Sequence, residues 1–201
     1  RRGLVGAPRW RAPHGGAAVG DLEHEPGVDE AVALDEAVLL LALARRAVAV
    51  VLARGRLADP ARRELLWAGA LHEVGMMVSH HDHHRHSAYL LSHVDAAGFS
   101  QSQLRRLGAL VLGQRGGRRK VDEGLALEAF AWQVLCLRLA IIWCHARGDV
   151  QADALRLKRN GNVAALGVDD GWSNANPRTL HLLGEEAVAW VRGGPLKLEL
   201  R

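Results

Sequence analysis

Seven histidines lie between Leu71 and His93, in the stretch LHEVGMMVSHHDHHRHSAYLLSH. Imidazole is the commonest metal ligand among side chains, and in its protonated form it also binds anions. A metal cluster, a phosphate-binding surface and a pair of helices with solvent-exposed histidines would each produce such a run. The residues around the stretch must therefore decide between these three interpretations.

The first possibility is a metal site. His72 and Glu73 follow an apolar helical pattern and resemble the His-Asp pair of the HD phosphohydrolase superfamily, with Glu in place of Asp. The resemblance implies two further ligands, a histidine from an upstream helix and an aspartate from a later one. Residues 28–57 contain no histidine, and the later helix offers only Cys144 and His145. We therefore expect no metal in this chain, and His72 and Glu73 are the candidates if one binds.

The second possibility is an anion site, which the charge balance allows. The chain has 201 residues, 49% of them hydrophobic, and a formal net charge of +4. Nearly all its basic residues are arginine, which suits bidentate contacts to phosphate. GC-rich coding also favours arginine over lysine, so the arginine bias can reflect either phosphate binding or codon usage.

Two cysteines, Cys136 and Cys144, lie eight residues apart on one predicted helix. Two helical turns separate them by about 12 Å, which is too far for a disulfide. We interpret them as reduced core residues of a cytoplasmic protein.

The elements that position the histidines are mostly helical. We expect a poorly ordered lead-in over residues 1–27 and a helical domain over 28–149, whose first helix is too often interrupted by charges to span a membrane. Asp59 and Pro60 should begin a second helix that runs to Gly75. The later helices are expected to include His86–Val94, to run from a Ser100 cap to Gly113, and to run from Asp122 or Glu123 to Gly148.

Residues 150–201 should form a small α+β unit. Asn160-Gly161 is a strong hairpin signal between segments 154–159 and 162–168, and Leu155 and Leu157 alternate with charged residues. A short helix, Gly184–Val191, and a strand, Leu196–Leu200, complete the tail. The predicted fold class is therefore mostly α, an HD-like helical bundle followed by a small α+β tail with a β-hairpin.

The histidines themselves fall on a predicted connector, Ser79 to Arg85, and on the start of the next helix. Ser87 would lie with Arg85 at the edge of that helix. Exposed N–H groups and imidazolium at a helix N-terminus bind anions. We expect His81 and His83 to be solvated loop residues, and we assign His80, His84 and His86 to the anion site.

Several longer stretches carry a resemblance to a known family. They are WAGALHEVG, HHRHSAYLL, GALVLGQRG, LRLAIIWCHARGD and NPRTLHLLGEEAVAW, from about Arg63 to the end of the chain. Together they resemble the C-terminal half of the exopolyphosphatase/guanosine-pentaphosphate phosphohydrolase family. LHEVG followed at this interval by HRHSAY is the most specific part.

The resemblance implies an activity, a metal and a dimer. Members hydrolyse a terminal phosphoanhydride of polyphosphate, or convert pppGpp to ppGpp, with Mg. Their chemistry belongs to N-terminal lobes, while the HD-like region helps to form the dimer and the channel for polyphosphate. We find no phosphate-loop motif before Arg63, and the first residue is Arg1, so we expect a piece of a longer protein without those lobes, their Mg or any catalytic residue.

The partners expected from this resemblance are inorganic polyphosphate and a second copy of the chain, with no membrane and no nucleic acid. The expected polyphosphate-binding residues are His80, His84, Arg85, His86, Arg115, Arg118, Arg119 and Lys120. Two other functions stay open. One is a free-standing HD-type, metal-dependent nucleotide phosphohydrolase, and the other is a scaffold or degenerate gene product without a ligand.

Overall fold

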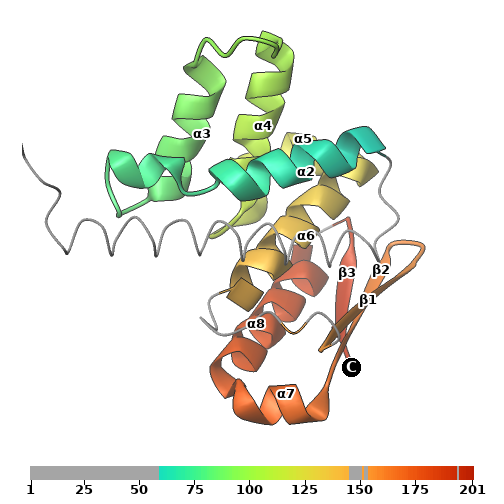
Figure 1. Ribbon diagram of the computed structural model, residues 1–201. Helices are drawn as coiled ribbons and strands as arrows, with labels where there is room; N and C mark the ends of the chain where they lie inside the picture. The colour runs from blue at the N-terminus through green and yellow to red at the C-terminus, as the bar shows by residue number, and fades with distance from the viewer. Residues whose placement is uncertain (1–58, 145–150, 152–153, 194) are drawn as a thin grey trace, which may run out of the picture.

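The computed structural model describes residues 59–144, 151, 154–193 and 195–201. A group of helices is followed by a small three-stranded sheet with its own helices (Figure 1). This confirms the predicted fold class, mostly α with a small α+β tail. The lead-in over 1–27, the helix over 28–57 and the boundary at 149 lie outside the described residues, and the division into two domains stays a prediction.

The second predicted helix, α2 (Asp59–Leu71), ends earlier than expected. The chain leaves the helix after Leu71 and forms a short 3₁₀ turn, η1 (Val74–Met77), instead of continuing to Gly75. Close packing explains the change, because a Cβ on Gly75 would lie 2.2 Å from the His83 carbonyl oxygen and 2.3 Å from the Ser87 nitrogen. The glycine therefore marks where this turn meets the next helix, and not the end of α2.

The histidine-rich helix, α3 (His83–His93), starts three residues earlier than the sequence suggested. His83 and His84 therefore belong to its first turn and not to a connector, and both are buried. The next helix, α4 (Gln101–Gly113), begins as predicted, with Ser100 and Gln103 forming a reciprocal capping box. Figure 1 shows α3 and α4 side by side.

The long predicted helix from Asp122 or Glu123 is broken in two. A 3₁₀ turn, η2 (Arg118–Val121), leads into the short α5 (Asp122–Leu125), and the central helix α6 (Glu128–Cys144) follows. The break lets Phe130 fold back onto Gly124, where an added Cβ would lie 2.7 Å from the ring. The expected end at Gly148 lies outside the described residues.

The tail contains the predicted hairpin. The strands β1 (Leu155–Asn160) and β2 (Val163–Val168) pair antiparallel, and Gly161 has a φ of 59°, which suits glycine at this turn. A third strand, β3 (Lys197–Leu200), pairs parallel to β2.

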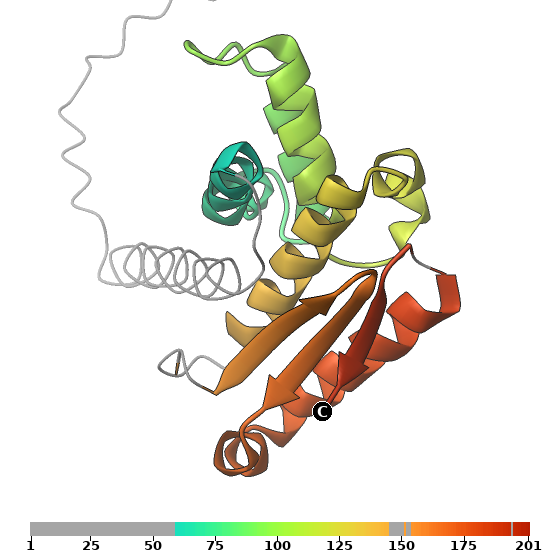
Figure 2. The same ribbon diagram turned by 90° about the vertical axis from the view of Figure 1, so that its right-hand side faces the viewer.

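Two helices connect β2 to β3. The short α7 (Asp170–Ala175) was not predicted, and α8 (Pro177–Gly193) begins seven residues before the expected Gly184. Proline at the first helical position explains this start, because a helix leaves that N–H unbonded in any case. Figure 2 shows α8 lying along one face of the sheet.

The core is one continuous apolar cluster centred on α6. It includes residues from α2 and α4, from the sheet and from α8, such as Leu65, Leu198 and Trp190. Arg106 of α4 adds a polar link, since its Nε lies 2.9 and 3.0 Å from the Glu64 carboxylate of α2 and its terminal nitrogen donates to Gln133 of α6. The helices and the tail therefore share one hydrophobic interior.

Both cysteines lie in this core without a disulfide, as predicted. Burial raises the pKa of each thiol to about 12, so both stay protonated at neutral pH. Within the part of the chain that the structure describes, no helix is long and apolar enough to cross a membrane.

The close approach at Gly75 gives a first prediction. Gly75→Ala should lower the free energy of unfolding by about 3 kcal/mol, because the new Cβ overlaps backbone atoms of α3 that cannot move away independently. Gly184→Ala is the matched control, since its Cβ would meet nothing within 4 Å and alanine favours a helix interior. Chemical denaturation measures both, and equal midpoints for the two variants would contradict the packing argument.

Candidate functional site

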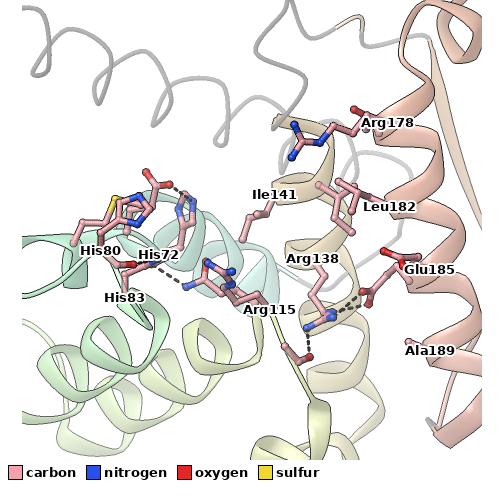
Figure 3. A pocket seen from close by; sticks show the side chains of 17 residues that line it. His72, His80, His83, Arg115, Arg138, Ile141, Arg178, Leu182, Glu185 and Ala189 are labelled. Atoms are coloured by element: carbon pink, nitrogen blue, oxygen red, sulfur yellow. Dashed lines mark hydrogen bonds and ion pairs between the residues drawn. The ribbon is translucent and has the colours of Figure 1, made fainter.

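A cleft of about 730 Å³ lies between the histidine-rich segment and α8. Figure 3 shows His72, His80, His83 and Arg115 on one side of it, with Arg178 and Leu182 of α8 on the other. Ile141 and Arg138 of α6 lie between these walls. The cleft therefore brings together segments that are far apart in the sequence.

The wall that carries His72 is held by one buried serine. The Gly75 N–H donates to Ser87 Oγ at 2.8 Å, and that hydroxyl donates to the His72 carbonyl at 2.9 Å. Gln114 Nε2 donates to the same carbonyl, also at 2.9 Å. Ser87 is fully buried and does not lie at the edge of the helix as expected. Gly75 of HEVG and Ser87 of HRHSAY thus hold the turn after α2 in place.

Four charged residues form what we term the cationic cluster: Arg85, Arg115 and Lys120, with Asp82 among them. Lys120 Nζ donates to the Arg115 carbonyl at 2.6 Å, and Arg85 Nε lies 3.7 Å from Asp82 Oδ2. Burial lowers the pKa of Lys120 to about 8, and the positive charges of Arg138, Arg85 and Arg115 add to this shift, while Asp82 opposes it. Positive charge is therefore crowded at this place.

His84 lies buried beside the cationic cluster. Its pKa is lowered to about 4, first by burial and then by the charges of Lys120 and Arg115, with Asp82 acting in the opposite direction. Its Nδ1 is buried without a hydrogen bond and lies 4.0 Å from Asp82 Oδ1. At neutral pH the ring is therefore uncharged, so His84 offers a hydrogen bond and not the imidazolium that the sequence suggested.

The other histidines of the stretch occupy different surroundings. His81 is exposed, as predicted, but His83 is buried and burial lowers its pKa, so the prediction of a solvated loop residue was wrong for His83. His80 is exposed and lines the cleft. His86 is half-buried on α3 and is not among the residues of the cleft wall.

Two of the expected arginines do not join the cationic cluster. Arg118 turns toward α8, where its guanidinium lies 4.4 Å from the centre of the Trp190 ring and donates to the Ala189 carbonyl at 2.6 Å. Arg119 is exposed. The structure therefore gathers Arg85, Arg115 and Lys120 around His84, and places Arg118 in a packing contact.

Sequence reasoning missed the ion pair that holds the cleft together. Arg138 of α6 binds both carboxylate oxygens of Glu186 of α8, at 2.5 and 2.7 Å, and both side chains are buried. Its remaining nitrogen donates to the carbonyls of Gly113 and Gly116, which flank Arg115. A lone arginine in the apolar stretch of α6 was the signal that could have indicated this role.

Arg178 was also missed. It lies in the first turn of α8 and reaches the cleft from the wall opposite Arg115 (Figure 3). The Asn176-Pro177 dipeptide is a helix-start signal that could have placed Arg178 at a helix N-terminus, where anions bind.

The metal candidates His72 and Glu73 lie side by side. His72 Nε2 lies 3.6 Å from Glu73 Oε1, and His72 Nδ1 donates to the Gly69 carbonyl at 2.9 Å. Cys144 is a protonated thiol in the core, and His145 lies outside the described residues. Among the residues that the structure places, no three His, Cys, Asp or Glu side chains come together closely enough to hold a metal. This donor set does not fit a metal centre.

Comparison with known proteins identifies relatives. The family model "Ppx/GppA phosphatase, domain III" matches residues 29–187. A guanosine-5'-triphosphate,3'-diphosphate pyrophosphatase of Aliivibrio fischeri is 35% identical over 134 residues, 65% of this chain and 27% of the relative. One of Photobacterium profundum is 34% identical over 145 residues, 70% of this chain and 29% of the relative. The chain thus spans about a quarter of the length of these curated relatives.

The buried ion pair gives a second prediction. Glu186→Gln leaves the Arg138 guanidinium buried with a neutral partner, and it should lower the free energy of unfolding by about 3 kcal/mol. Glu185→Gln removes the same charge from an exposed neighbour and should change it by less than about 0.5 kcal/mol. Urea denaturation of the two variants provides the comparison, and a Glu186→Gln variant as stable as Glu185→Gln would argue against the pair.

The neutral state of His84 gives a third prediction. Its pKa in the folded chain is about 4, below the ordinary 6.5, so between these pH values the unfolded chain binds a proton that the folded chain does not. Stability should therefore fall as the pH is lowered through this window, and less so in His84→Gln. The exposed His81→Gln is the control and should follow the wild type. Denaturation at pH 7 and pH 4.5 distinguishes the variants, and equal losses in all three would refute the assignment.

Proposed function

Because this chain belongs to the Ppx/GppA phosphatase family, we propose that it is the phosphate-binding domain of a phosphohydrolase that cleaves a terminal phosphoanhydride. The substrate of that enzyme would be guanosine-5'-triphosphate,3'-diphosphate, after which the relatives are named, or inorganic polyphosphate. The chain itself would hold and orient the phosphates while groups elsewhere in a longer protein break the bond.

The observation that carries the proposal is the crowding of positive charge beside the cleft. Arg115 lines the cleft; burial is the main cause that lowers the pKa of His83, His84 and Lys120, and the charge of Arg115 adds to each shift. Like charges held this close raise one another's free energy, and a bound anion would relieve the repulsion. Burial, and then the charges of Arg138, Arg85 and Arg115, lower the pKa of Lys120 to about 8, so an anion bound beside Lys120 would favour its charged form.

The residues of this site would act by position and charge. Arg115 and Arg85 would donate charge-assisted hydrogen bonds to phosphate oxygens, and Arg suits them because its planar donors match two oxygens at once. Lys120 would contribute a point charge, and His80 a further donor at the rim of the cleft. Arg138 would serve as a positioning residue, because it binds the carbonyls on either side of Arg115.

Magnesium, which the family resemblance implies, would supply neutralisation of the phosphate charge when bound. Among the described residues no three His, Cys, Asp or Glu side chains come together closely enough to hold it, and we place no catalytic step on His72 or Glu73. A free-standing metal-dependent phosphohydrolase stays the alternative. Dimerisation through this domain and a cytoplasmic location stay predictions.

The cationic cluster gives a fourth prediction. Arg115→Ala combined with Lys120→Ala should weaken the binding of long-chain polyphosphate by about tenfold to a hundredfold, since two charge-assisted contacts are lost. The dependence of affinity on salt should also become shallower. Fluorescence anisotropy with labelled polyphosphate at several KCl concentrations measures both effects.

The control is Arg62→Ala combined with Arg63→Ala, which removes the same charge from exposed positions on α2. It should bind polyphosphate nearly as well as the wild type. Binding by the wild type should also weaken as the pH rises through about 8, because Lys120 then loses its proton. Equal affinity in the two double variants would show that charge alone, and not this cluster, accounts for binding.

A further inference from the structure

Lys120 of η2 differs from the other lysines of the chain in its surroundings. The sequence contains three lysines in all. Lys158 of β1 and Lys197 of β3 are exposed on the sheet, whereas Lys120 is half-buried and hydrogen-bonded to the loop after α4. One polypeptide therefore carries a half-buried amine together with two exposed amines that serve as internal references.

The charge state of Lys120 follows from these surroundings. Burial is the main cause that lowers its pKa to about 8. Positive charge adds to the shift, from Arg138, Arg85 and Arg115, and Asp82 opposes it. Burial acts because an ammonium loses its hydration, and the guanidinium groups act because like charges repel. At neutral pH roughly one Lys120 side chain in ten is therefore an uncharged amine, compared with fewer than about one in a thousand for a lysine of ordinary pKa.

The hydrogen bond of Lys120 leaves that amine free to react. Its Nζ donates to the Arg115 carbonyl oxygen at 2.6 Å. A carbonyl only accepts, so an uncharged amine makes the same bond with one N–H and keeps its lone pair available. A lysine nitrogen that has lost its charge through burial or a neighbouring cation acts as a nucleophile. The fold therefore holds a nucleophilic nitrogen at a defined place.

The neighbours of Lys120 indicate which electrophile would react with it. Arg115 and Arg85 belong to the cationic cluster, and both are exposed and accessible to a small anion. Guanidinium groups bind phosphate oxygens through paired, charge-assisted hydrogen bonds. An acyl phosphate combines a reactive acyl carbon with a phosphate leaving group, so these cations would hold the phosphate and stabilise it as it departs. An acylating agent without a phosphate would have no such contact.

We propose that Lys120 is a modification site at which a small acyl phosphate acylates the side chain. The Lys120 nitrogen attacks the acyl carbon with its lone pair and forms an amide C–N bond. The bond between the acyl carbon and the phosphate oxygen breaks, and inorganic phosphate leaves with that electron pair. The proton that the nitrogen loses passes to water. The proposal rests on the proposed function, because it uses the same phosphate-binding cations.

Acylation of Lys120 would change the phosphate site. An amide carries no charge, so the modified side chain no longer supplies positive charge to the cationic cluster. We expect the acetylated chain to bind long-chain polyphosphate about fivefold more weakly than the unmodified chain. The modification would thereby couple phosphate binding to the concentration of acyl phosphate.

The test treats the full chain with acetyl phosphate and follows acetylation of each lysine by peptide mass spectrometry. Lys120 should be acetylated about tenfold faster than Lys158 or Lys197, since it combines an uncharged amine with phosphate-binding neighbours. Inorganic tripolyphosphate should slow the reaction at Lys120 and leave that at Lys158 unchanged. Acetic anhydride, which carries no phosphate, is the comparison reagent, and its preference for Lys120 should be several-fold smaller.

Variants of an arginine test the role of the bound phosphate. Arg115→Ala should slow acetylation of Lys120 by acetyl phosphate about fivefold, while acetic anhydride should modify Lys120 nearly as fast as in the wild type. Arg62→Ala removes the same charge from an exposed position on α2, and it should leave both rates unchanged.

Variants of two lysines test the consequence for binding. Lys120→Arg keeps the positive charge but cannot form the amide, so its affinity for polyphosphate should survive treatment with acetyl phosphate. Lys158→Arg is the matched control, and it should lose affinity on treatment as the wild type does.

The outcomes separate the two proposals. If polyphosphate binds through Arg115 and Lys120 but acetyl phosphate modifies Lys120 no faster than Lys158 and Lys197, the modification site is refuted and the phosphate site stands. Equal preference of both reagents for Lys120 would also refute it, since burial and not a bound phosphate would then select the lysine. If polyphosphate does not bind and acetyl phosphate shows no preference, the proposed function and the modification site fail together.

Discussion

The buried ion pair between Arg138 and Glu186 is the interaction on which the arrangement of the cleft depends. It joins the central helix to α8, and the same guanidinium binds the carbonyls of Gly113 and Gly116 at the end of α4. Trp190 Nε1 adds a further hydrogen bond to Glu186 at 2.6 Å. A buried charge is costly unless its partners are all in place, so this pair specifies one geometry and disfavours alternatives. The loop that carries Arg115 is therefore set by a contact made far away in the sequence.

The residues that carry the family resemblance mostly serve packing. Gly75 allows the turn after α2 to touch the backbone of α3, and Ser87 connects the two through hydrogen bonds in both directions. These contacts leave little room for another residue at Gly75 in HEVG or at Ser87 in HRHSAY. A recognisable motif in this chain is thus a mark of its architecture, and the charged groups around it carry the proposed binding.

The candidate site combines features that a purely electrostatic surface would lack. Arg85, Arg115 and Lys120 lie near a neutral, buried His84, and Arg115 lines a cleft whose floor is apolar and whose walls include carboxylates. Crowded positive charge favours an anion of any kind, whereas the floor and the carboxylates discriminate between anions. Under the proposed function, this combination would suit a phosphorylated small molecule better than a general polyanion.

Local chemistry in the sequence was enough to predict several elements. The hairpin at Asn160-Gly161, the helix cap at Ser100, the buried unpaired cysteines and the family all follow from residues close together in the chain. Tertiary contacts decided the rest: the break before Phe130, the early start of α3 that buries His83 and His84, and the meeting of Arg138 with Glu186. Helical periodicity shows which residues share a face, but it does not show which faces pack together. The pKa values of His84 and Lys120 depend on that packing, because burial and neighbouring charges set them.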